Sequence, residues 1–123
     1  MRVIIAGSRI ITEPQKIETA ILHANFRITE VVSGGAPGVD RLGEKWAHEH
    51  QIPVRRFIPK WDLYGKGAGM IRNKEMVQNA DALIAIWDGN SPGTANMIQI
   101  AQQNRLSVFV LQEGCLTKEW REC

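Results

Sequence analysis

A glycine-rich loop between an apolar run and a helix-like stretch is the segment best suited to chemistry. Its candidate ligand-binding residues are Ser33, Gly34, Gly35, Ala36, Gly38, Asp40 and Arg41. Successive glycines let neighbouring backbone N–H groups converge on one point, where the following helix adds unpaired N–H groups and the positive end of its dipole. This pattern predicts an anion-binding loop, although a tight turn with positive φ would also use glycine. Asp40 could bind a ribose hydroxyl or a ligand amine, or could simply complement the helix dipole.

A second loop repeats this device closer to the C-terminus. Its candidate residues are Asp88, Gly89, Ser91, Gly93 and Thr94, and Ser91 is the predicted N-cap of the helix that follows. We therefore expect two helix N-termini to face one cleft, each following one of two adjacent strands. Asp88 could meet a ribose or a metal, but Asp followed by Gly is also an ordinary turn.

The remaining candidates lie in the loop after the first apolar run and in the segment before and at the start of the third helix, and most of them are basic, amide or aromatic residues. These are Gly7, Ser8, Arg9, Trp61, Tyr64, Lys66, Arg72 and Asn73. An arginine offers a planar fork to a phosphate or carboxylate, and further positive charge would strengthen phosphate binding. The aromatic side chains could stack on a base or could instead cover the core, and the glycines beside them would allow a flap to move.

The order of apolar segments predicts how these loops are positioned. Val- and Ile-rich runs, apolar on consecutive positions, read as parallel strands covered on both faces, with helical periodicity between them. The expected strands span residues 3–6, 30–33, 54–58, 83–87 and 108–111. The sequence thus predicts a single Rossmann-like α/β domain over residues 1–111, a three-layer α/β/α sandwich with a five-stranded, mainly parallel sheet. In such sheets ligands bind beyond the carboxyl ends of the strands, near the point where strand order reverses.

Details of the connections also follow from the sequence. Thr12 and Gln15 have the spacing of a capping box at the start of the first helix. Residues 60–69 form the only long irregular connection that we expect, and the third helix is expected to start at Arg72 and Asn73. The tail, residues 112–123, is expected to dock on the domain or on a partner, as Trp120 suggests.

Composition narrows the classes of partner and cofactor. The net charge of +2 gives no support to nucleic-acid binding. Cys115 and Cys123 would close only a short loop, and we interpret them as free thiols of a cytoplasmic protein. No apolar run approaches the roughly 20 residues of a membrane span, so no membrane partner is expected. The histidines lack metal-ligand spacing, so we expect no metal.

Taken together, the loops resemble a known family. The motifs on which this resemblance rests are G-S-R at 7–9, S-G-G-A-x-G-x-D-R at 33–41, W-x-x-Y-G-K-x-A-G at 61–69, R-N at 72–73 and W-D-G-x-S-x-G-T at 87–94. In this order they resemble the YspA-like family of the SLOG superfamily, which also includes DprA and the LOG phosphoribohydrolases. The resemblance implies a Rossmann-like fold that binds nucleotides or nucleotide derivatives. It also implies homo-oligomers, since superfamily members are often dimers.

One departure from the LOG motif separates the possible functions. Aligning Gly93 and Thr94 with its Gly-Thr pair puts Met97 where LOG enzymes carry a catalytic glutamate. Methionine cannot assist cleavage of an N-glycosidic bond. The primary hypothesis is therefore a binding module or sensor for a phosphorylated nucleotide-like ligand, with catalytic residues unassigned. A LOG-type N-glycosidase, with Glu75 in place of the missing acid, and DprA-like binding of single-stranded DNA are the alternatives.

Overall fold

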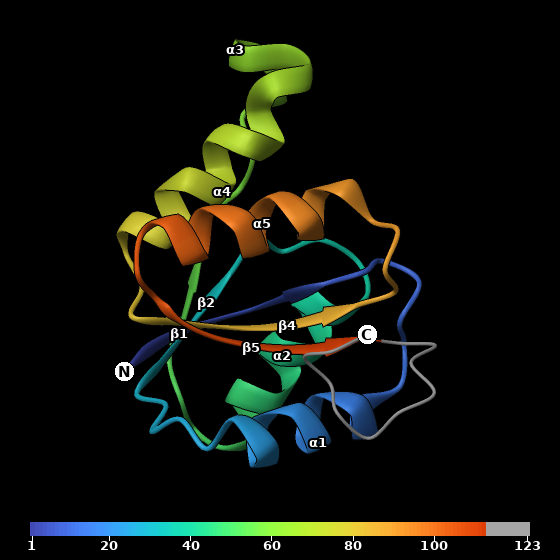
Figure 1. Cartoon of the computed structure of the whole chain (residues 1–123), viewed down its shortest axis with the longest axis vertical. Helices are drawn as coiled ribbons and strands as arrows, with labels where there is room; N and C mark the ends of the chain where they lie inside the picture. The colour runs from blue at the N-terminus through green and yellow to red at the C-terminus, as the bar shows by residue number, and fades with distance from the viewer. Residues whose placement is uncertain (113–123) are drawn as a thin grey trace.

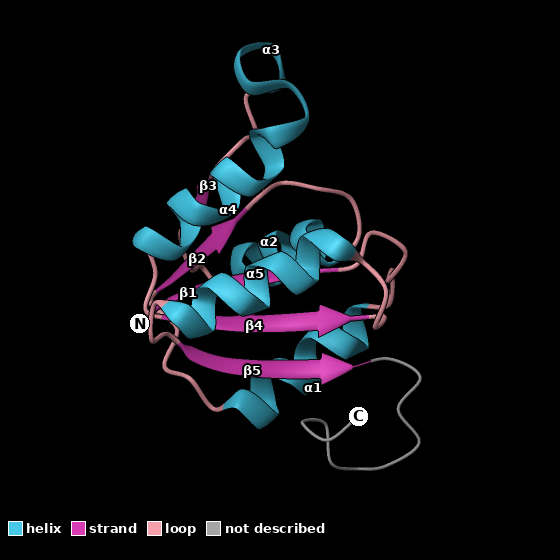
Figure 2. Cartoon of the chain, turned by 45° about the horizontal axis from the view of Figure 1, so that its top comes forward, coloured by secondary structure: helices cyan, strands magenta, loops and turns pink. Residues whose placement is uncertain are grey.

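The computed structural model describes residues 1–112, which form one twisted sheet between two layers of helices (Figures 1 and 2). The strands are β1 (Arg2–Gly7), β2 (Glu30–Ser33), β3 (Val54–Arg56), β4 (Ala82–Trp87) and β5 (Ser107–Gln112). They pair in parallel in the order β3-β2-β1-β4-β5. The predicted three-layer α/β architecture is confirmed, and the sheet is parallel throughout rather than only mainly so.

Helices cover both faces of the sheet because its central strands are apolar on both sides. The helices of one face are α1 (Pro14–Ala24) and α2 (Val39–Glu49), and those of the other are α4 (Ala68–Gln78) and α5 (Pro92–Gln103). Successive side chains of β4 belong to two different hydrophobic cores, one on each face of the sheet. Ile84 and Ile86 belong to the core under α1 and α2, whereas Leu83 and Ala85 belong to the core under α4 and α5. These side chains are fully buried.

The segment expected to be irregular is largely helical. A short helix α3 (Trp61–Tyr64) leads through the 3-10 turn η1 (Gly65–Gly67) into α4, which starts at Ala68. Arg72 therefore lies in the second turn of α4 and not at its start. The glycines of this segment predicted a loop because glycine disfavours helix, but that penalty is only about 1 kcal/mol per residue and packing overrides it. Ala68, which is 1% exposed, shows that this turn does pack.

Three smaller predictions about element boundaries also needed correction. α1 begins at Pro14 with Glu13 as N-cap and no side-chain cap, so the expected capping box at Thr12 does not form. Proline suits the first helical position, which moves the start of the helix past the threonine. β3 ends at Arg56, two residues early, and β5 extends to Gln112. The tail with Trp120 and both cysteines lies outside the described residues.

The start of α2 packs closely on the loop that follows β1. Gly38 has φ +81°, and a Cβ built there would lie 2.6 Å from the Ser8 carbonyl oxygen and 2.5 Å from that of Arg9. The next residue, Val39, donates its N–H to Ser8 O at 3.4 Å. Only glycine combines this backbone conformation with such an approach. Gly38 is therefore required by the fold, whatever binds beside it.

We expect Gly38→Ala to lower the free energy of unfolding by about 3 kcal/mol, because it adds backbone strain and a clash with backbone atoms. Gly67→Ala is the matched control, since Gly67 has an ordinary negative φ and nothing within 4 Å of an added Cβ. Urea unfolding monitored by circular dichroism measures both variants. Equal stability of the two would contradict the packing described for α2.

Candidate functional site

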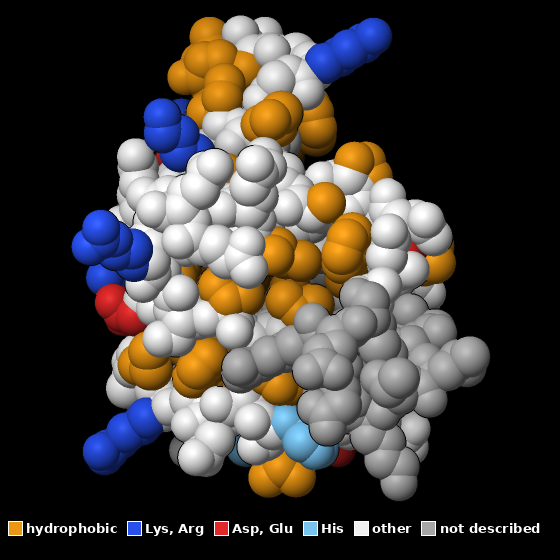
Figure 3. Space-filling model, viewed as in Figure 1, with side chains coloured by type: hydrophobic (Ala, Val, Ile, Leu, Met, Phe, Trp, Pro, Cys, Tyr) orange, Lys and Arg blue, Asp and Glu red, His pale blue; other side chains and the backbone are white. Residues whose placement is uncertain are grey.

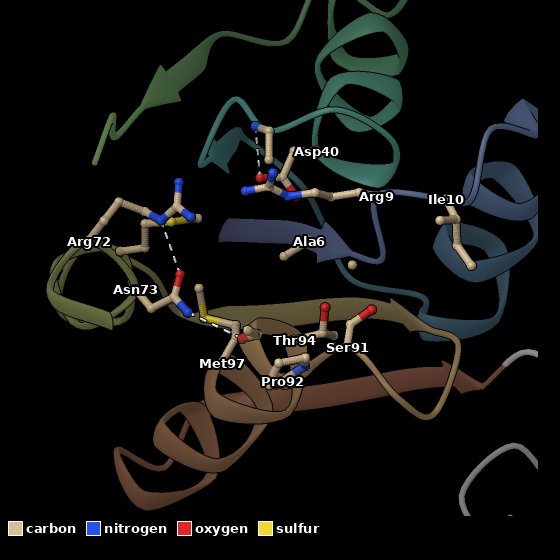
Figure 4. Close-up of a pocket in the computed structure, with 14 residues that line it drawn as sticks. Ala6, Arg9, Ile10, Asp40, Arg72, Asn73, Ser91, Pro92, Thr94 and Met97 are labelled. Carbon is tan, nitrogen blue, oxygen red and sulfur yellow. Dashed lines mark hydrogen bonds between the residues drawn. The ribbon is translucent and has the colours of Figure 1, made fainter. Parts of the chain in front are cut away.

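A cavity of about 330 Å³ opens at the carboxyl edge of the sheet, beside the ends of β1 and β4 (Figure 4). This is the point where the strand order reverses, because β2 and β3 extend from β1 to one side and β4 and β5 to the other. The predicted site residues that line it are Gly7, Arg9, Ala36, Asp40, Arg72, Asn73, Ser91, Gly93 and Thr94. Loops following three different strands and the side of α4 thus meet at one place.

The floor of the cavity is apolar and was not anticipated as such. It is made by Ala6 at the end of β1, Met76 of α4 and Met97 of α5, all of them buried. Ile10 and Pro92 complete the lining that the motifs did not identify. Helical periodicity puts Met76 and Met97 on the apolar faces of their helices, but it does not show that they also line a cavity. Met97, the departure from the LOG motif, thus closes the floor under the helix N-terminus.

Two guanidinium groups face each other across the cavity (Figure 4). Arg72 is held in place by Nη1 donating to the Gly34 carbonyl oxygen at 2.8 Å and Nε donating to Asn73 Oδ1 at 3.1 Å. Its pKa is lowered from the ordinary arginine value, mainly by burial and in part by the positive charge of Arg9. Arg9 itself is exposed and has no hydrogen-bond partner among residues 1–112. An anion between the two would relieve their repulsion.

Asp40 is the buried carboxylate of the site. It is 6% exposed, and its Oδ2 accepts the Ala36 N–H at 3.3 Å. Burial raises the pKa of Asp40 to about 6, although the Ala36 N–H and the positive charge of Arg72 oppose the shift. At neutral pH the group is therefore mostly ionised, but protonation is within physiological reach.

The glycine loop does not present its N–H groups as the sequence suggested. The Gly35 N–H donates to Ser33 Oγ at 3.0 Å, and the Ala36 N–H is taken by Asp40. Ser33 in turn donates to Glu44 Oε2 at 2.6 Å, and Glu44 is paired with Arg56. Because these loop donors already have internal acceptors, an anion seated directly on Gly35 and Ala36 is not supported.

The start of α5 presents free donors to the cavity. The N–H groups of Gly93 and Thr94 have no acceptor among the described residues, and both residues line the cavity. Ser91 is the N-cap by position, as predicted, but its hydroxyl bonds to Ser8 and Asp88 instead of capping the helix. The two helix N-termini follow β2 and β4. These strands were expected to be adjacent, but β1 lies between them.

Asp88 stabilises the turn before α5. Its carboxylate accepts the N–H groups of Asn90 and Ser91, both at 2.8 Å, and the Ser91 hydroxyl. These backbone hydrogen bonds lower the pKa of Asp88 to about 2. The group is thus fully ionised and already satisfied, which is the ordinary role of an Asp-Gly turn.

The other predicted site residues lie outside the cavity lining. They are Ser8, Ser33, Gly34, Gly35, Gly38, Arg41, Trp61, Tyr64, Lys66, Asp88 and Gly89. Some of these support residues that do line it, as Gly34 does by accepting the hydrogen bond from Arg72. Trp61, Tyr64 and Lys66 instead lie on α3 and η1, away from the cavity. Within residues 1–112, no three acidic, histidine or cysteine side chains cluster as a metal site would require.

We expect the free energy of unfolding to fall as the pH rises from about 4 to about 6, because of Asp40. The unfolded chain releases this proton near the ordinary value of 3.8, whereas the folded chain holds it up to about 6. The folded state therefore binds more protons in this window. In Asp40→Asn the loss is absent, so the free energy of unfolding of the variant relative to wild type should increase by about 2 kcal/mol from pH 4 to pH 7.

Urea unfolding of both proteins at each pH gives this difference directly, because every group common to the two cancels. A difference that does not change with pH would show that Asp40 is not a buried acid.

Comparison with known proteins agrees with this fold. The model of the YspA, cpYpsA-related SLOG family matches residues 1–64. The Gene 61 protein of Mycobacterium phage D29 is 34% identical over 117 residues, covering 88% of this chain and 94% of the phage protein. Among solved structures, DNA processing protein A (DprA) from Streptococcus pneumoniae shares the fold, with a TM-score of 0.75 at 18% identity over 98% of this chain. This chain spans about half of the DprA chain, 53% of its length. The chain belongs to the YspA, cpYpsA-related SLOG family.

No helix among the described residues is both long and apolar enough to cross a membrane.

The comparisons confirm the family and the fold that the motifs implied, and the protein is a SLOG-family domain.

Proposed function

We propose that the cavity binds a nucleotide or a nucleotide-derived phosphorylated ligand. The observation that carries this proposal is the meeting of two guanidinium groups and the free N–H groups of α5 above an apolar floor. Such a site suits a molecule that is anionic at one end and flat and apolar at the other. Domains of the SLOG superfamily bind nucleotide-derived ligands as a class, which supports the same conclusion.

The parts of the ligand can be assigned to parts of the cavity. The phosphate would lie between Arg9 and the N–H groups of Gly93 and Thr94, where charge-assisted hydrogen bonds are available. The base would cover Met76 and Met97, since thioether side chains pack well on aromatic rings. The volume of about 330 Å³ is at the small end of ligand sites, which favours a mononucleotide over a dinucleotide.

Arg9→Ala should weaken binding of adenosine monophosphate about 10- to 100-fold, the effect of losing one charge-assisted hydrogen bond. Because Arg9 has no partner within residues 1–112, the fold should be unaffected. Arg27→Ala, another exposed arginine outside the cavity lining, controls for the loss of one positive charge. Isothermal titration calorimetry measures both. Equal affinities of the two variants, or no binding by wild type of any nucleoside monophosphate tested, would contradict the assignment.

Gly34→Ala perturbs the opposite wall of the cavity. A Cβ at Gly34 would lie 2.4 Å from Arg72 Nη1 and 2.8 Å from Asp40 Oδ2. The end of the arginine side chain can move away, so we expect the variant to fold but to bind adenosine monophosphate at least about tenfold more weakly. Retained affinity with a displaced arginine would remove Arg72 from the proposed site. Thermal unfolding of the same sample confirms that the variant is folded.

Hydrolysis of the ligand is a second candidate that one observation favours. Asp40 is a carboxyl group lining the cavity, with a pKa of about 6, suited to an acid that protonates a departing base. Glu75, which the sequence offered as a substitute acid, is exposed on α4 and does not line the cavity. Chromatography of nucleoside monophosphates incubated with the protein should then show free base, and Asp40→Asn should abolish its release. If the wild-type protein releases no free base, binding without hydrolysis remains as the proposed function.

Binding of single-stranded DNA has less support. The likeness to DprA is one of fold at 18% identity. The net charge of +2 also provides little attraction for a phosphate backbone.

A further inference from the structure

Residues 58–71 form an apolar arm that projects beyond the body of the domain. It comprises α3, η1 and the first turn of α4, and it extends past the edge of the sheet in both cartoon views (Figures 1 and 2). Its exposed large hydrophobic side chains are Ile58, Trp61, Leu63, Tyr64, Met70 and Ile71. Figure 3 shows hydrophobic side chains gathered over this end of the molecule.

The arm is unlike the rest of the described surface. Elsewhere the exposed large hydrophobic residues are scattered singly, as Ile10 and Leu22 are. No residue of α3 or η1 is buried, and α3 packs mainly against η1 and α4 rather than against the sheet. A group of large exposed hydrophobic side chains of this kind on a folded domain usually marks an interface.

We propose that the arm is the contact surface between two copies of this chain. Large side chains exposed to this degree offer on the order of 600 Å² per copy, so a two-fold contact would bury ~1,200 Å², the lower limit of a specific interface. A two-fold contact sets the same patch against itself. The patch must therefore complement its own chemistry.

The charges of the arm meet this requirement. Lys60, Asp62 and Lys66 all lie within it, and none has an ion-pair partner among residues 1–112. Because both signs are present, the negative charge of each arm can offset positive charge of the other. The aspartate of one copy would find lysines of the other, and the symmetry would repeat each pair.

The interface and the ligand cavity use different residues, although α4 contributes to both. Ile71 is exposed on the arm, whereas the next residue, Arg72, lines the cavity. None of the six apolar residues of the arm lines the cavity. Self-association can therefore be tested without disturbing the proposed nucleotide site.

Leu63→Asp tests the proposal, and Leu22→Asp is its matched control. Both leucines are exposed, Leu63 by 67% on the arm and Leu22 by 76% on α1. Sedimentation velocity from about 1 to 100 µM should show dimer for wild type and for the control. Leu63→Asp should remain monomeric, which means a dimer dissociation constant raised at least about hundredfold.

Several outcomes would overturn the proposal. Wild type could stay monomeric up to the highest concentration, or Leu63→Asp could dimerise as the control does. A monomeric wild type that binds phosphatidylcholine vesicles through the arm would assign this surface to a lipid instead. Thermal unfolding midpoints matched between the two variants establish that any difference in association does not come from misfolding.

Discussion

Ser8 connects the parts of the structure on which the site depends. It is 1% exposed, its N–H donates to Ile86 O of β4 at 3.0 Å, and its carbonyl oxygen accepts the first N–H of α2. Its hydroxyl accepts the Asp88 N–H at 3.0 Å and lies 3.0 Å from the hydroxyl of Ser91. One small residue thereby joins the ends of β1 and β4 to the starts of α2 and α5. A larger side chain would fill this junction, and an apolar one would leave buried polar groups unpaired.

The electrostatics of the cavity are unfavourable without a ligand. Burial lowers the pKa of Arg72 and raises that of Asp40, so both groups are charged at neutral pH at some cost in free energy. Arg9 adds a second positive charge close to Arg72, whose attraction to Asp40 only partly offsets the cost of burial. An anionic ligand would improve this arrangement of charges. Functional sites commonly show such perturbed groups, whereas the ion pair of Arg2 and Asp81 is exposed and far from the cavity.

The sequence predicted the fold well because apolar runs and turn residues carry it. β1, β2 and β4 are buried strands whose composition excludes other environments, and the position of the cavity follows from the order of the strands. What sequence reasoning missed depends on where side chains point. Nothing in the motif shows that Ser33 and Asp40 turn back to accept the N–H groups of Gly35 and Ala36. The helical arm was missed because its glycines outweighed its apolar residues.

The parallel order of the sheet also has a consequence for how the protein folds. Val3 pairs with Ala82, so the central strand pair joins residues that are far apart in the sequence. During synthesis, β1 cannot be flanked on both sides until β4 has left the ribosome, and contacts this distant in sequence form slowly. The cavity needs β1, β2, α4 and α5 together. Ligand affinity should therefore appear only in the complete sheet, and a bound nucleotide would stabilise the whole domain rather than any fragment of it.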